Sequence, residues 1–273
     1  MSKPILLSID LDFFSFEDPY WDLAHREGML PEVLWAIRLM STAMSGINLV
    51  KETSFDKADF HPLKTLEVLR EAGWQVSSDC KISLSDSHMY AFPAWDSLTN
   101  CRIVNFDAHH DLGYASRQDM RKRWKSKRIQ CEDWLWFYLR RHVHTDAVNI
   151  FPSWKPGGDW PDHPHWDGSS VGRRVRGAQF SHELLEALAG EVVAIHIARS
   201  DAWLPPWHDW VVPAMVGDMA RESRWQEGRI RVFGDTDPTE PRDFDVERHL
   251  KLNEVRERRL RALMKHQHQV SSP

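Results

Sequence analysis

The sequence contains few cysteines and no long apolar run. Its three cysteines, at positions 80, 101 and 131, form no close pair, so neither a disulfide framework nor a zinc ribbon is expected. No stretch reaches the roughly 20 apolar residues that a membrane-spanning helix needs. The N-terminus leads directly into an apolar strand, without the pattern of a signal peptide. We therefore expect a cytoplasmic protein with no membrane partner.

The chain also lacks an excess of positive charge. The chain has 35 Lys and Arg against 40 Asp and Glu, a formal net charge of −5. This balance argues against a nucleic-acid partner and favours a cationic substrate. With 273 residues, 42% hydrophobic and 27% charged, the chain is long enough for one large α/β domain with a sizeable core. We find no internal repeat and no linker, and predict a single domain over residues 1–273.

The most informative stretch begins with a short apolar segment, Arg102–Phe106, which predicts a buried strand. Asp107, His109 and Asp111 follow it directly. Ligands of open α/β sheets bind at the carboxyl ends of the strands, and burying unpaired acids is costly. A metal ion would supply the missing positive charge, whereas a polar loop with a capping aspartate would need none.

Two further strand ends carry the same kinds of side chain. The N-terminal apolar strand bears Asp10 and Asp12 one residue apart, so both acids are expected on one face. A third apolar segment ends in Asp86 and His88. A pair of like charges needs a cation nearby. Oxygen and nitrogen ligands without thiolate suit Mn²⁺ better than structural Zn²⁺, and catalytic Zn²⁺ or Fe²⁺ are the alternatives.

These motifs resemble those of arginases and related ureohydrolases. The resemblance lies in S-I-D-L-D with a later D-P, in D-A-H-H-D and in D-S-H, at Ser8–Asp12 with Asp18–Pro19, Asp107–Asp111 and Asp86–His88. The fuller wording is similar to a divergent branch, the peptide arginase family. The blocks shared with that branch are I-D-L-D-F-F-S, F-D-A-H-H-D-L, E-D-W and I-A-R-S, at Ile9–Ser15, Phe106–Leu112, Glu132–Trp134 and Ile197–Ser200.

The resemblance implies a three-layer α/β/α fold with a mostly parallel central sheet. The strand bearing Asp10 and Asp12 would be relocated to the N-terminus, because in arginases it comes after the D-A-H-x-D strand. The resemblance also implies two Mn²⁺ ions per chain. One would be held by Asp10, His88, Asp107 and Asp111, and the other by Asp10, Asp12, Asp107 and His109.

Other polar residues are candidates for catalysis and substrate binding. Glu132 is expected to bind the guanidinium group or transfer a proton, although an acid in the first turn of a helix also suits the helix dipole. His110 is expected beside the ligands but pointing away from His109, and with Asp111 it completes the catalytic candidates. Ser200 and Asp201 end a core strand and are candidate substrate contacts.

The rest of the chain predicts alternating helices and strands. His196, inside an apolar strand, is expected to be a core histidine rather than a ligand. The basic stretch Arg117–Arg128 is either a solvated segment or a docking surface for an acidic peptide. Helices are expected at 21–45, with Pro31 opening the stronger part, and at 63–72, 131–142, 180–189, 207–223 with an interruption near Pro213, and 244–268. Strands are expected at 74–84, 147–151, 191–200 and 229–233, and one long loop at 152–177.

The function that these features predict is hydrolysis of arginine side chains in a precursor peptide to ornithine and urea. The tryptophans and histidines of the 152–177 loop (Trp154, Trp160, Trp166, His163 and His165) would form a rim that grips the peptide. Three alternatives remain: a ureohydrolase of small molecules, a deacetylase-like hydrolase with one metal, and a peptide-binding protein with a vestigial metal site.

Overall fold

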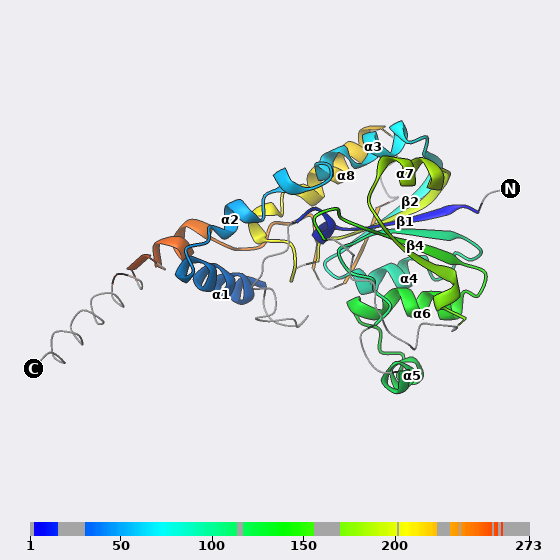
Figure 1. Ribbon diagram of the computed structural model, residues 1–273, viewed down its shortest axis with the longest axis horizontal. Coiled ribbons are helices and arrows are strands. Elements are labelled where there is room, and N and C mark those ends of the chain that lie inside the picture. The colour runs from blue at the N-terminus through cyan, green and yellow to red at the C-terminus, as the bar shows by residue number, and fades with distance from the viewer. Residues whose placement is uncertain are drawn as a thin grey trace, which may run out of the picture.

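The computed structural model describes residues 3–15, 31–113, 117–155, 170–200, 202–222, 230–234, 236–252, 254–255 and 258. The centre of the molecule is one sheet of seven parallel strands in the order β5-β4-β3-β1-β6-β2-β7 (Figure 1). The strands are β1 (Ile5–Asp10), β2 (Gln75–Ser85), β3 (Arg102–Phe106), β4 (Asp146–Phe151), β5 (Val175–Gln179), β6 (Glu191–Ala198) and β7 (Ile230–Phe233).

The first strand of the sequence is the central strand of the sheet. All six residues of β1 are buried, and β1 pairs with β3 on one side and β6 on the other. Leu7 and Ile9 pack into one core cluster, whereas Leu6 packs into the other. Side chains of a strand point alternately to the two faces, so β1 is apolar on both sides. A strand of this kind belongs inside a parallel sheet that is covered on both faces.

Helices cover both faces of the sheet, which makes the fold a three-layer α/β/α arrangement with an all-parallel sheet (Figure 1). One layer contains α3 (Thr65–Glu71), α7 (His182–Leu188) and α8 (Val211–Glu222). The other contains α4 (Ala91–Trp95) and α6 (Trp134–Arg141), with α5 (Arg117–Ser126) on its outer side. The predicted fold class is thus confirmed, with a sheet that is parallel throughout the described strands.

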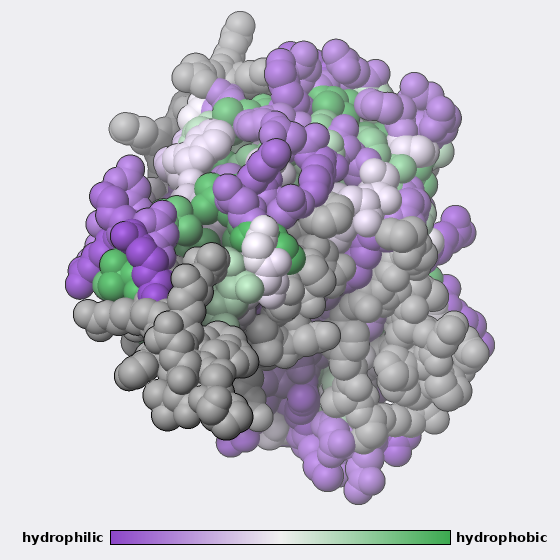
Figure 2. All heavy atoms as spheres, turned by 60° about the vertical axis from the view of Figure 1, so that its left-hand side comes forward, coloured by the Kyte–Doolittle hydropathy of each residue, from purple (hydrophilic) through white to green (hydrophobic). Residues whose placement is uncertain are grey.

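A smaller unit lies beyond the carboxyl ends of the strands. It contains α1 (Pro31–Met44) and α2 (Leu49–Glu52), together with the chain that follows β7 (Figure 1). Its core joins Trp35, Leu39 and Leu49, with Trp207 and Phe244 packed against them. The described surface on this side of the molecule is mostly hydrophilic, with small separate hydrophobic areas (Figure 2).

Several predicted boundaries need correction. The predicted 152–177 loop ends too late, because Val175–Gln179 is the edge strand β5, paired with β4. Pro213 does not interrupt a helix: α8 begins at Val211, so the proline stands in its first turn, where backbone N–H groups have no intrahelical partner. The helix predicted at 180–189 is shorter, because Ser181 caps it and its hydroxyl accepts from the Leu184 N–H.

Some predictions fall outside the described residues. These are Asp18–Pro19 of the motif, the segment 21–30, the loop residues 156–169 with Trp160, His163, His165 and Trp166, and most of 244–268. The described part of the predicted C-terminal helix is helical over residues 246–252. Within the described part of the chain, no single helix has both the length and the apolar character to cross a membrane. One pair of helices, Glu32–Met44 with Leu49–Glu71, meets both criteria together but is bent by 107°.

Candidate metal centre

The centre of the site is the end of β1. β1 ends at Asp10, and a 3-10 turn begins at Leu11. The sequence pattern predicted Asp12 on the same strand as Asp10. The structure corrects this prediction, because Asp12 lies in the 3-10 turn that follows the strand. The Asp10 carboxylate caps this turn by accepting from the Asp12 N–H at 3.1 Å. Both carboxylates are buried, with Asp10 4% and Asp12 0% exposed.

The loop after β3 brings the next acids to the same place. Asp107 is fully buried; its Oδ1 accepts from the His109 N–H at 2.7 Å and its Oδ2 from the Asn105 side chain at 3.2 Å. Asp111 adopts a left-handed backbone with φ of 52°, which an aspartate tolerates better than most residues. Position 113 also has a left-handed backbone, with φ of 83°, and it favours glycine more strongly. A Cβ at this position would lie 2.7 Å from the Met120 sulfur.

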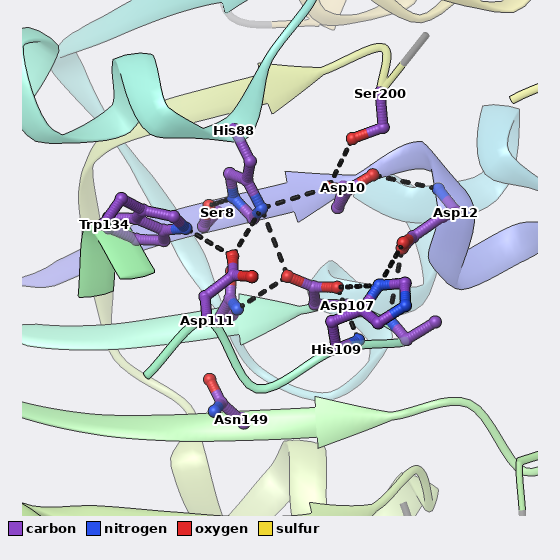
Figure 3. A network of polar contacts seen from close by, with 12 residues as sticks. Ser8, Asp10, Asp12, His88, Asp107, His109, Asp111, Trp134, Asn149 and Ser200 are labelled. Atoms are coloured by element: carbon purple, nitrogen blue, oxygen red, sulfur yellow. Dashed lines mark hydrogen bonds and ion pairs between the residues drawn. The ribbon is translucent and has the colours of Figure 1, made fainter. Parts of the chain in front are cut away.

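His88 faces three carboxylates at once. It opens a short 3-10 turn, His88–Tyr90, directly after β2. Its Nδ1 lies 3.1 Å from an oxygen of Asp10, 3.1 Å from one of Asp107 and 2.9 Å from one of Asp111 (Figure 3). The opposite ring nitrogen, Nε2, is 2.5 Å from the Ser8 hydroxyl. Ser8 thus fixes the ring orientation that presents Nδ1 to the acids.

Two groups of possible metal ligands share one residue. Asp10, His88 and Asp107 form the first ligand group, and Asp12, Asp107 and His109 form the second; within each group the ligand atoms lie within 4.8 Å of one another. Asp107 belongs to both. The buried Asp and His side chains of this site could therefore hold a metal ion, and the first group lies deepest because all three of its residues are buried.

Electrostatics support a bound cation. Burial, with the neighbouring charges of Asp10 and Asp107, raises the pKa of Asp12 to about 7. Burial and the charge of Asp107 raise the pKa of Asp111 well above its usual range. Burial works against protonation of His88, but the surrounding carboxylates outweigh it and raise its pKa. Four buried carboxylates thus compete for too little positive charge, which a divalent cation would supply.

Neighbouring side chains hold the ligands in place. The Ser200 hydroxyl donates to Asp10 Oδ2 at 2.5 Å, and the Trp134 indole N–H donates to Asp111 Oδ2 (Figure 3). His196 lies behind His88, with nearly parallel rings 6.1 Å apart. Its two ring nitrogens contact the hydroxyls of Ser83 and Ser85 at 2.8 and 3.0 Å. His196 is thus a buried, hydrogen-bonded core histidine, as the sequence indicated.

Among the residues of the two ligand groups, His109 is the most exposed. The His109 side chain is 19% exposed, whereas those of His88, Asp12 and Asp107 are at most 1% exposed. The ring of Trp203 lies against His109, with centroids 4.9 Å apart. The Arg38 guanidinium lies 5.7 Å from the centre of the same Trp203 ring. The Trp203 ring therefore lies beside the partly exposed His109 side chain.

The structure brings all six predicted metal ligands together, but it places the other candidates differently. The Glu132 carboxylate pairs with Arg123 of α5 at 3.0 Å and belongs to neither ligand group. His110 is buried, and its Nδ1 accepts from the Leu112 N–H at 2.9 Å. Ser200 contacts the ligand Asp10. Asp201 lies outside the described residues.

Sequence reasoning missed several supporting residues. Asp133 accepts from the Gln130 N–H and from Arg123, and so fixes the start of α6, where Trp134 reaches Asp111. The E-D-W motif carries this signal at its second and third residues, Asp133 and Trp134. Ser8 and Asn105 lie inside apolar strands, and only the assembled sheet shows that they point to the site.

Comparisons with protein-family models, curated proteins and solved structures found no match to this chain.

Proposed function

We propose that this chain is a dinuclear metal-dependent hydrolase of the peptide arginase type, which converts arginine side chains of a peptide to ornithine and releases urea. The observation that carries the proposal is the pair of buried ligand groups that share Asp107. A shared carboxylate between two groups suits two neighbouring ions, which argues against the alternative of a hydrolase with one metal. The motif resemblance to peptide arginases supplies the substrate class.

The donor set favours two Mn²⁺ ions. Asp10, His88 and Asp107, with Asp111 beside them, would hold one ion, and Asp12, Asp107 and His109 the other. All donors are oxygen or imidazole nitrogen, which suit Mn²⁺ among the divalent metals. Ions bound there would lower the pKa of a water molecule and so supply a nucleophile at neutral pH.

The surroundings of the partly exposed His109 ring suit a planar cation. A guanidinium group entering beside His109 would meet the Trp203 ring, and aromatic faces attract cations. Water adds to the guanidinium carbon, the bond from that carbon to the side-chain nitrogen breaks, and the departing amine takes up a proton. The products are urea and the ornithine ammonium group.

The test compares substrates on one metal-loaded preparation. An arginine-containing peptide, free L-arginine, agmatine and an acetyl-lysine peptide are incubated with the protein, and urea, acetate and ornithine are measured. We expect urea and ornithine from the peptide, with little urea from free arginine. The Asp107→Asn variant, prepared in the same way, controls for contaminating activity and should release none.

Each other result has a clear meaning. Preference for free arginine or agmatine would support a small-molecule ureohydrolase, and release of acetate would support a deacetylase-like enzyme. Metal binding without turnover of any of the four substrates would contradict the proposed activity and support a vestigial site.

A further inference from the structure

Arg199 is a buried cation that joins four separate parts of the chain. It follows β6 directly and is 2% exposed. Its Nε donates to Asp86 Oδ1 at 2.6 Å, and its Nη1 donates to the Glu240 carbonyl at 2.6 Å and lies 3.7 Å from Asp209. Its backbone N–H donates to the Ser85 carbonyl at 2.8 Å. Arg199 thereby holds the ends of β2 and β6 against the start of α8 and the chain after β7.

The chain after β7 is fastened at both ends of residues 236–242, which we name the strap. At one end the Thr236 hydroxyl donates to Asp86. At the other end the Arg242 guanidinium binds both oxygens of Asp209, with Nη2 at 2.5 Å from Oδ1 and Nε at 3.0 Å from Oδ2. The side chains of Arg242 and Asp209 are 6% and 2% exposed. Arg199, Arg242 and Asp209 are buried at their side chains and Asp86 is largely so, with 12% exposed, and the two arginines balance the two aspartates.

This network reaches the first ligand group by two routes. Asp86 lies two residues before His88, in a turn that is also held by the Ser85 hydroxyl, which donates to the Ser87 carbonyl at 2.7 Å. Ser200 follows Arg199 with a left-handed backbone, φ 53°, and donates to Asp10 at 2.5 Å. His88 and Asp10 are two of the three residues of the first ligand group.

The second ligand group is supported from elsewhere. Asp12 accepts from the Ala108 N–H at 3.1 Å and contacts His109 Nδ1 at 2.8 Å. The His109 ring lies against Trp203. The contacts of Asp12 and His109 with each other and with Ala108 come from the turn after β1 and the β3 loop rather than from the strap. Trp203 supplies no ligand atom, and its segment is the part of this surrounding that the strap reaches, through the Leu204 carbonyl.

We propose that Arg199 is a positioning residue for the first ligand group, and that the strap is part of that metal site although it supplies no ligand. Arg199 binds the strap and also holds the two segments that place His88 and Asp10. Affinity for the metal at the first group then depends on residues 236–242, whereas affinity at the second group does not. This inference rests on the proposed metal centre.

The experiment isolates each ligand group with a second substitution. In a His109→Ala background only the first group retains its ligands, and in a His88→Ala background only the second does. We add Arg199→Met to each and measure Mn²⁺ affinity by calorimetry and the absorption spectrum of bound Co²⁺. Arg199→Met should weaken Mn²⁺ binding about 10- to 100-fold and change the Co²⁺ spectrum in the His109→Ala background, because loss of groups that orient ligands has effects of this size. In the His88→Ala background it should change affinity less than about twofold.

Two further variants separate positioning from general destabilisation. Arg174 is a matched control: it donates to the carbonyls of Leu139, His142 and Thr145, at the end of α6, and Arg174→Met should leave both affinities unchanged. Arg242→Met loosens the strap without touching either ligand turn, and it should weaken the first group in the same direction as Arg199→Met. It also serves as the test if Arg199→Met does not fold.

The outcomes distinguish the inference from the proposal beneath it. Equal losses in both backgrounds, or unchanged first-group affinity in Arg199→Met and Arg242→Met, would overturn the positioning role alone. A wild-type protein that binds no divalent ion would overturn the metal centre and the positioning role together.

Discussion

Replacing Asp107 tests the shared-ligand arrangement most directly. Asn preserves the shape of the side chain but removes the charge from a group that is fully buried between both sets of ligands. Burial opposes ionisation of Asp107, but hydrogen bonds from His109 and His88 outweigh it and lower the pKa of this carboxyl. A carboxamide cannot offer two anionic oxygens to two cations. We therefore expect Asp107→Asn to lose metal binding at both groups.

The size of the effect follows from linkage. A ligand at 100 times its dissociation constant stabilises the folded state by about 2.7 kcal/mol. Two ions would therefore add about 5 kcal/mol to the unfolding free energy of the wild-type protein. In a domain of this size, each kcal/mol raises the melting temperature by about 2 to 4 °C. The wild-type melting temperature should thus rise by about 10 to 20 °C with saturating Mn²⁺.

The assay is thermal unfolding by circular dichroism with Mn²⁺ or with chelator, read together with metal content. Asp107→Asn should show almost no metal-dependent increment, and His109→Ala about half of the wild-type increment. The matched control is Asp146→Asn on β4, where the carboxylate binds Lys3 and Arg102 at 2.5 and 2.9 Å; it should keep the full increment. An Asp107→Asn protein that still gains half of the increment would refute the shared-ligand reading.

Three other predictions follow from single contacts. Trp134→Phe removes the donor to Asp111 and should weaken Mn²⁺ binding about 10- to 100-fold, measured by calorimetry; unchanged affinity would mean that the indole does not orient this acid. Glu132→Gln should keep both metals and lower the free energy of unfolding by less than about 1 kcal/mol, because the ion pair between Glu132 and Arg123 is partly exposed. Denaturant unfolding measures this, and the rate at which the variant releases urea from the peptide substrate decides whether Glu132 also transfers a proton. Burial lowers the pKa of His208 to about 4, so the native state binds fewer protons than the unfolded state between about pH 4 and 6.5 and stability falls as pH drops through this window. The difference in unfolding free energy between wild type and His208→Gln should change by about 3 kcal/mol between pH 7 and pH 4, and a constant difference would count against this origin.

The sequence predicted the parts of the site that lie on apolar strands. Asp10, His88 and Asp107 each stand where a buried segment changes to polar residues, and that change is visible one strand at a time. The parallel sheet then brings their carboxyl ends together without further information. The fold class was predictable for the same reason, because near-continuous apolar strands alternate with helical segments.

The rest depended on pairings between distant segments. Arg199 binds Asp86, which lies 113 positions earlier in the chain, and Glu240, which lies 41 positions later. The sequence around Arg199 does not indicate either partner. β5 escaped prediction because it is an edge strand whose residues are largely exposed, in the sequence V-R-G-A-Q. The ion pair of Glu132 with Arg123 was likewise not predictable, because it joins two segments whose packing only the structure shows.

The central place of β1 has a consequence for the order in which the protein can be made. Residues Ile5 to Asp10 are synthesised before their partners in the sheet, Arg102 to Phe106 and Val192 to Ala198. A strand that is apolar on both faces must therefore wait for most of the chain before it can be covered. Pairings this distant in sequence slow folding, and an exposed apolar strand in the meantime invites aggregation. Expression yield in cells should therefore depend on chaperones that shield β1 during synthesis.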